Sequence, residues 1–356
     1  MIYKLIAIIM TTSLLYARVD LAWIGDENLI GVGLDPKSLL LSDQDLWQYT
    51  QEPTPLSLPQ VPYLRILKKH PLEFSSPHQH VLGMYTDYFV DLFLSQPSHG
   101  LAARLATAHS VPLASTIVVS KFQANMRDLP GLIARFLRDY GHNLPSQIII
   151  LLSGYDACTV DYHDILSQKD YELRLKSSIE ALLSAAQTGH KKINIDVWAP
   201  FSLAQLVSNP LISKKMIKVS DQVNPITCQA LNSINTVASS QHRLLFASRT
   251  YCSSLMAIPD RARVEVGLQL FESDLTFQTR IQKKQDEILA FIASRIRGHK
   301  KAYDYLKRIE DTPRTKVSLH DSLFDLRFTG EDIADDCLHF SETGQNKIFN
   351  LMSTGI

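Results

Sequence analysis

The sequence predicts an α/β fold, a three-layer α/β/α sandwich with a mostly parallel sheet. The first observation behind this prediction is a series of short apolar, β-branched runs, typical of parallel strands buried on both sides. The second is that segments with apolar residues at helical spacing separate most of these runs. Because parallel strands need crossover connections, we expect the helices to cover both faces of the sheet.

Six apolar runs are predicted strands. The run at 147–153 is the strongest, because its residues between Gln147 and Ser153 are all Ile or Leu. The run at 192–198 alternates and is soon followed by Pro200, which indicates a strand nearer the edge of the sheet. The full set is Val19–Ile24, Ser115–Ser120, Gln147–Ser153, Lys192–Trp198, a weaker run at Arg243–Ala247, and Lys316–Leu323 as the final strand.

Four segments with helical spacing are predicted helices. Asp128 is expected to cap the first of them, and Pro130 fits its first turn. Gly189 is expected to end the second. The apolar positions lie within Leu132–Leu137, Leu175–Ala186, Leu275–Arg297 and Ile348–Met352, and two weaker candidate helices lie at Tyr63–Lys69 and Thr86–Leu94.

The chain is predicted to form one secreted domain. Residues 1–17 have an apolar run after Lys4 and a small residue, Ala17, before Arg18, which is the layout of a secretory signal peptide. No later stretch approaches the roughly 20 apolar residues of a membrane helix, so we expect no transmembrane segment in the mature chain. Residues 18–356 then form a single domain with insertions at about 35–112 and 201–273, secreted or periplasmic.

Charge and cysteine spacing argue against two classes of function. The 36 basic and 36 acidic residues balance, so no basic field would attract nucleic acid. The cysteines are widely spaced without a C-x-x-C pair, which argues against a structural zinc site and for up to two disulfides. Three pairings are open, and the more local one joins Cys228 with Cys252 and leaves Cys158 with Cys337.

Asp336 and His339 form the pair that most suggests catalysis. They lie in a Gly-containing loop ahead of the last predicted helix, where an aspartate can orient an imidazole base. Ligand sites in parallel sheets lie beyond the carboxyl ends of the strands. Three more segments follow predicted strands there: 25–33 (Gly-Asp-Glu-Asn-Leu-Ile-Gly-Val-Gly), 123–130 with its Asp-Leu-Pro end, and 153–158 (Ser-Gly-Tyr-Asp-Ala-Cys).

Together with residues 336–341 (Asp-Cys-Leu-His-Phe-Ser), these segments resemble the SGNH or GDSL hydrolases, most closely the phospholipase-B-like branch. The blocks of that branch are similar to G-D-S-L-T-A-G-V-G, S-G-A-x-x-x-D-L-P, G-G-N-D-x-C and D-C-x-H-F-S. The last block matches best, and the resemblance spans about Val19 to Ile348. It implies a flavodoxin-like α/β/α sandwich that hydrolyses carboxylic esters, often acyl lipids, with a serine nucleophile and no metal or organic cofactor.

The resemblance also assigns roles to single residues. His339 is the expected base and Asp336 its orienter. Glu27 stands where the family has its nucleophilic serine. Gln123 and Tyr155 stand where the family has the glycine and asparagine that help to hold the oxyanion, and the supporting positions are Asp26, Gly154 and Asp156.

Glu27 changes the expected chemistry. Loss of the triad serine lowers the rate about a millionfold, and loss of one oxyanion donor about a hundred- to a thousandfold. An ionised Glu27 would also oppose the developing negative charge and could keep His339 protonated. A Glu27 nucleophile would give a reactive anhydride with an ester. If the first block is out of register, Ser153 is the nearest alternative serine.

Two hypotheses for function follow. One is an ester hydrolase resembling phospholipase B, with an acyl ester or lipid as substrate and an altered nucleophile. The other is a degenerate relative that keeps the fold and binds an acyl ligand, a glycan or a protein partner. A metal site built from Asp26, Glu27, Asp156, Asp336 and His339 is a weaker alternative, and the oligomeric state stays open.

Overall fold

The computed structural model of the chain describes residues 20–30, 84–86, 100–111, 116–121, 124–152, 154–157, 165–201, 205, 209–217, 225–228, 274–335, 337 and 339–354. The predicted signal peptide, the candidate helix at Tyr63–Lys69 and the weaker strand at Arg243–Ala247 lie outside these residues. So does the candidate helix at Thr86–Leu94, apart from Thr86, which belongs to a strand.

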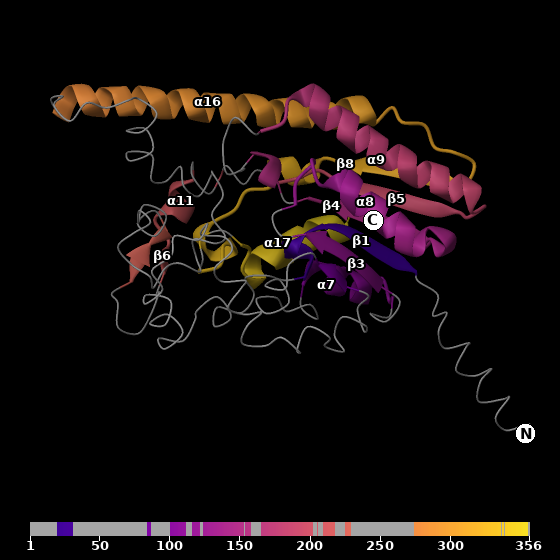
Figure 1. The fold of residues 1–356 in the computed structure, drawn as a ribbon. Helices are drawn as coiled ribbons and strands as arrows, with labels where there is room; N and C mark the ends of the chain where they lie inside the picture. The colour runs from indigo at the N-terminus through magenta and orange to yellow at the C-terminus, as the bar shows by residue number, and fades with distance from the viewer. Residues whose placement is uncertain are drawn as a thin grey trace, which may run out of the picture.

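A parallel sheet of six strands forms the centre of the described part, which confirms the predicted α/β fold class (Figure 1). The strand order is β2-β3-β1-β4-β5-β8. Every pairing within it is parallel. The strands are β1 (Leu21–Asp26), β2 (Met84–Thr86), β3 (Thr116–Lys121), β4 (Gln147–Leu151), β5 (Ile193–Trp198) and β8 (Thr315–His320). The alternating run at 193–198 lies next to the edge strand β8, in agreement with its pattern.

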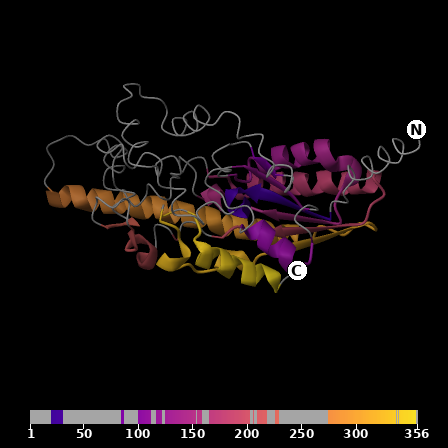
Figure 2. The same cartoon turned by 90° about the horizontal axis from the view of Figure 1, so that it is seen from below.

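Helices cover both faces of this sheet. Along β1, Leu21 and Trp23 pack with α7 (Leu101–Ala108) and α17 (Glu342–Ser353), while Ala22 and Ile24 pack with α8 (Leu129–Tyr140), α9 (Gln168–Thr188) and α16 (Asp274–Leu306). Successive strand side chains point to opposite faces, so the two apolar clusters lie on opposite sides. Figure 2 shows the sheet between α8 and α9 on one side and the yellow α17 on the other.

Smaller elements connect these layers. Short 3-10 turns follow several strands, and two further strands form a separate antiparallel sheet. The turns are η1 (Glu27–Ile30), η4 (Gly141–Asn143), η5 (Tyr155–Ala157), η9 (Ser322–Asp325) and η10 (Gly330–Asp332), and the smaller sheet consists of β6 (Met216–Ile217) and β7 (Ile226–Thr227) after the short helix α11 (Pro210–Ser213). Within the described residues, no helix has the length and apolar character needed to cross a bilayer.

The capping residues of α8 and α9 agree with the predictions in all but one respect. Ser167 begins α9 by accepting a hydrogen bond from the Asp170 N–H at 3.1 Å, and Gly189 ends that helix as predicted. Pro130 lies in the first turn of α8 and Asp128 occupies the N-cap position, both as predicted, but the Asp128 side chain makes no capping hydrogen bond. Its carboxylate instead pairs with Lys121 at the end of β3, because the strand and helix termini lie together there.

Candidate active site

Three of the four predicted blocks lie at adjacent strand ends. β1 lies between β3 and β4, so Gly25 pairs with Ser120 on one side and Leu151 on the other. The segments that follow these strands therefore start side by side at the carboxyl edge of the sheet, where α/β proteins place their ligand sites.

Gly25 and Asp26 shape the first block. A Cβ atom on Gly25 would lie 1.8 Å from the carbonyl oxygen of Leu151, so only glycine allows this approach of β4. Asp26 is fully buried, and its Oδ1 accepts hydrogen bonds from the backbone and side-chain N–H groups of Asn28 at 3.1 and 3.2 Å. This local turn ends β1 and begins η1 at Glu27, whose side chain lies outside the described part.

Gly154 and Tyr155 shape the third block. Gly154 has φ +95°, and a Cβ atom there would lie 2.2 Å from the carbonyl oxygen of Phe201, which follows β5. Both facts require glycine. Tyr155 is 2% exposed and belongs to the apolar cluster on the α7 and α17 face, together with Leu29 of η1. Tyr155, which the resemblance aligns with an asparagine, is thus an aromatic member of the core.

Asp156 joins the second block to the third. Its Oδ1 accepts a hydrogen bond from the backbone N–H of Met126 at 2.8 Å, and Met126 lies in the segment that leads into α8. Burial raises the pKa of the carboxyl, the Met126 bond opposes this shift and the nearby Asp128 adds to it, so that the pKa is about 7. Oδ2 is buried and has no hydrogen-bond partner within the described structure. The carboxyl group thus holds a proton up to near-neutral pH.

Two buried tyrosines lie in the electrostatic environment of Asp156. Tyr171 of α9 and Tyr303 of α16 are fully buried, which raises the pKa of each hydroxyl, and the negative charge of Asp156 raises both further. Tyr303 donates a hydrogen bond to the carbonyl oxygen of Trp198 at 3.1 Å. The Tyr171 ring stacks on His299 with ring centres 4.2 Å apart. Tyr171 and Tyr303 thus belong to the apolar cluster on the α9 and α16 face of the sheet.

His339 lies in a tightly turned loop before α17. Its side chain is fully buried, and its carbonyl oxygen accepts a hydrogen bond from the Ala334 N–H at 2.7 Å. Ile333 and Phe340 pair as an antiparallel bridge, so residues 333–340 form a closed loop, here called the His339 loop. Ser341 follows the loop and caps α17 by accepting a bond from the Gly344 N–H at 3.3 Å.

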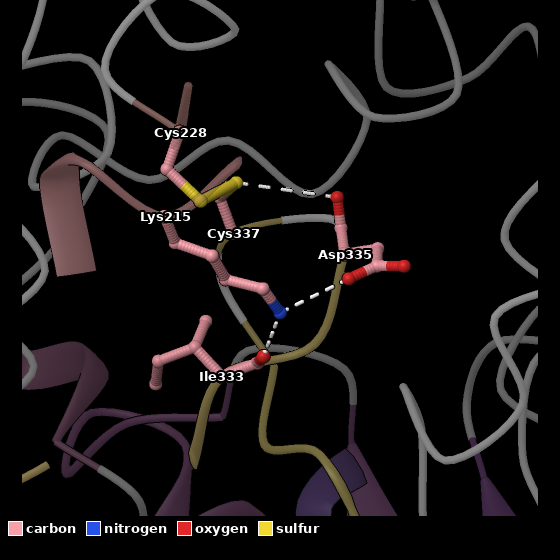
Figure 3. Close-up of a disulfide and its surroundings, with 5 residues drawn as sticks. All are labelled: Lys215, Cys228, Ile333, Asp335 and Cys337. Atoms are coloured by element: carbon pink, nitrogen blue, oxygen red, sulfur yellow. Dashed lines mark hydrogen bonds and ion pairs between the residues drawn. A yellow bond between two sulfur atoms is a disulfide. The ribbon is translucent and has the colours of Figure 1, made fainter. Parts of the chain in front are cut away.

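A disulfide between Cys228 and Cys337 fastens the His339 loop to the end of β7 (Figure 3). The more local pairing of Cys228 with Cys252, which left Cys337 to Cys158, is therefore wrong. That expectation considered distance along the chain alone, whereas the fold brings residues 109 positions apart within a Cα–Cα distance of 5.5 Å. Cys337 has φ 62°, a left-handed conformation held by the loop closure and the covalent bond.

An aromatic cluster supports the same loop from the sheet side. The Phe340 ring meets Phe201 edge-on, with ring centres 4.7 Å apart, and lies 4.7 Å from the ring centre of Phe328. Phe201 follows β5 and also contacts Gly154 through its backbone. The residue after His339 is therefore anchored beside the third block, which brings the fourth block toward the other three.

Three positions of interest lie outside the described residues, namely Gln123, Ser153 and Asp336. Their predicted roles remain predictions. Within the described part, no group of three or more His, Cys, Asp or Glu side chains is arranged to hold a metal ion.

A second aspartate–histidine pair, which the sequence did not indicate, lies on the sheet. His320 of β8 shares a hydrogen bond with Asp196 Oδ1 of β5 at 3.0 Å, and its ring stacks on Trp198 at 4.1 Å. The neighbouring Asp321 instead pairs with Lys307, which holds the pKa of that carboxyl below its usual range. In the register of β5 and β8, His320 is opposite Trp198 and reaches Asp196 two residues earlier on β5, so only knowledge of this strand pairing could have predicted the contact.

Comparison of the chain with models of protein families finds no match, and comparison with curated proteins finds none either.

Proposed function

We propose that this protein is a carboxylic ester hydrolase of the SGNH type, with acyl esters or lipids as its substrate class. The observation that carries the proposal is the Asp156–Met126 hydrogen bond, which ties the segment after β3 to the segment after β4. These are the second and third blocks of the resemblance, and the first begins on β1 between those strands. Fold alone would not support an activity, but this order of segments at one sheet edge does.

In this proposal His339 acts as the base and Asp336 orients it. The backbone N–H groups of Glu27 and Gln123 are the proposed donors to the oxyanion, since a backbone donor does not depend on the side chain. Tyr155 replaces the third donor, and its burial in the apolar cluster supports a packing role as well. With Glu27 at the nucleophile position, we expect turnover about a millionfold below that of a serine enzyme.

Glu27 specifically favours a second candidate function, binding without turnover. In this alternative the protein keeps the fold and holds an acyl ligand, a glycan or a protein partner at the carboxyl edge of the sheet. The complete burial of His339 also supports it, because a catalytic base must reach its substrate.

Esterase assays on three proteins separate the two candidates. The parent, His339→Ala and Glu27→Ser are each assayed on short and long p-nitrophenyl esters and on phospholipid vesicles. Parent activity that disappears in His339→Ala supports the hydrolase and contradicts the binding protein. An inert parent together with a Glu27→Ser variant that turns over esters supports binding without turnover. Inertness of both would contradict the proposed hydrolase site.

We also propose that the protein works in a periplasm or outside the cell. The Cys228–Cys337 disulfide supports this proposal, because such bonds persist in oxidising compartments. Both sulfur-bearing residues are fully buried, so the bond belongs to the interior of the folded protein. Fractionation of the source cells, followed by alkylation of free thiols before and after reduction, tests the location and the oxidation state together.

A further inference from the structure

Lys215 lies where a segment remote from the four blocks meets the His339 loop. It follows α11 and precedes β6, within the second predicted insertion. Its carbonyl oxygen accepts a hydrogen bond from the Cys228 N–H at 2.9 Å, and its side chain is only 18% exposed. The backbone of Lys215 is thus tied to the cysteine that forms the disulfide with the loop.

The Lys215 ammonium group contacts two residues at the start of the loop (Figure 3). It donates a hydrogen bond to the carbonyl oxygen of Ile333 and forms an ion pair with Asp335 Oδ1 at 3.0 Å. Ile333 pairs with Phe340 to close the loop, and Asp335 directly precedes Asp336. One cation therefore joins the start of the loop to the residue before the proposed orienter. Charge-assisted bonds of this kind are the stronger class in proteins.

The surrounding contacts hold this segment against the chain that leads into the loop. Gln205 donates to the carbonyl oxygen of Leu326 at 2.8 Å and accepts from the Phe328 N–H at 3.0 Å. Asn209 donates to the carbonyl oxygen of Phe328 at 2.6 Å. Because these bonds lie before Lys215 along the chain, they fix the position of the backbone from which the Lys215 side chain reaches the loop.

We propose that Lys215 is a positioning residue that sets the conformation of the His339 loop and thereby the environment of the His339 imidazole. The inference rests on the proposed function, in which His339 is the base. The disulfide holds Cys337 covalently, while Lys215 holds residues 333 and 335, so the two anchors restrain different parts of the loop. No contact of Lys215 with substrate is implied.

Four variants test the proposal. Lys215→Met removes the charge and the donors, Lys215→Gln keeps a donor without charge, and Lys215→Arg keeps both. Lys214→Met is the matched control, because Lys214 is the exposed neighbour and its side chain makes no hydrogen bond or ion pair within the described part. Thiol alkylation and far-ultraviolet circular dichroism first establish that each variant keeps the disulfide and the fold.

Two measurements that need no turnover give the readout. Amide hydrogen exchange of residues 333–340 is expected to speed up about tenfold or more in Lys215→Met, because a charge-assisted anchor is lost, and less in Lys215→Gln. The ring resonances of His339, assigned with His339→Ala, are expected to titrate at a different pH in Lys215→Met. Lys215→Arg and Lys214→Met are both expected to keep the parent's exchange rate for residues 333–340 and the parent's titration of His339.

The outcomes separate this proposal from the proposed function. Unchanged exchange and unchanged His339 titration in Lys215→Met would overturn the positioning role, whatever the esterase assays show. If Lys215→Met fails to fold, unchanged exchange and unchanged His339 titration in Lys215→Gln would overturn the positioning role instead. If Lys215→Met changes the loop while the parent protein hydrolyses no ester, the positioning role of Lys215 is supported and the proposed hydrolase is contradicted. In an active parent, Lys215→Met should lower kcat more than it changes KM.

Discussion

Replacement of Asp156 by asparagine should change how the free energy of unfolding depends on pH. Burial raises the pKa of the Asp156 carboxyl from the ordinary 3.8 to about 7, so the folded protein keeps a proton that the unfolded chain has released between these pH values. The free energy of unfolding therefore falls as the pH rises through this window and levels off above about 7. About 1.4 kcal/mol for each pH unit gives a loss of about 4 kcal/mol in total.

His299 conceals this trend in the parent protein. Burial lowers the pKa of its imidazole from 6.5 to about 4, so the unfolded chain binds the extra proton between these values. This group destabilises the fold as the pH falls through that window, by about 3 kcal/mol, which nearly cancels the contribution of Asp156. The stability profile of the parent alone is therefore uninformative, and the difference between parent and variant is the quantity to measure.

Urea unfolding of the parent and Asp156→Asn between pH 4 and 8, without reductant, measures that difference. Asparagine keeps the oxygen that accepts the Met126 bond and cannot ionise. The variant should gain about 4 kcal/mol relative to the parent across this range. Asp139→Asn is the control: the hydrogen bond from Arg138 holds the pKa of this carboxyl below its ordinary value, so Asp139 stays ionised across this range and the difference between this variant and the parent should stay constant. A difference that stays constant within about 1 kcal/mol would refute the argument.

Three further substitutions test the supports of the site, each by urea unfolding at neutral pH. Gly154→Ala should cost at least about 2 kcal/mol, because the new Cβ meets the Phe201 carbonyl at positive φ, and an unchanged midpoint would contradict that crowding. Ser341→Ala should cost about 1 kcal/mol through loss of the α17 cap, and a neutral result would show that solvent replaces the cap. Cys228→Ser combined with Cys337→Ser should cost about 5 kcal/mol, since the bond joins residues 109 positions apart; equal stability before and after reduction of the parent would argue against this.

The sequence predicted the centre of the fold because the signal there is local. The runs behind β1, β3 and β4 are mostly apolar, since each strand is buried against helices on both faces. It missed α7, a helix of 8 residues whose apolar positions pack with α17 from the far end of the chain. The apolar residues of α7 do follow helical spacing, but the segment is short and has no capping side chain, so the helical signal is weak. The α16 helix is also longer than its predicted range of 275–297, ending at Leu306.

Within the candidate site, the sequence indicated the positions where the backbone geometry allows only glycine. Gly25 and Gly154 belong to the blocks of the resemblance, and the structure supplies the reason, since a side chain would strike a neighbouring carbonyl oxygen at either position. The disulfide pairing and the contacts of Lys215 were not predictable, because both depend on where a distant segment docks. A lysine between a short helix and a two-residue strand has no distinctive pattern.

The Cys228–Cys337 bond has a consequence for the order in which the chain matures. During synthesis Cys228 emerges well before its partner, and all of α16 and β8 must follow before Cys337 is available. An oxidising catalyst that joined cysteines in order of appearance would therefore use Cys228 too early. The native bond can therefore form only after the last strand has been synthesised.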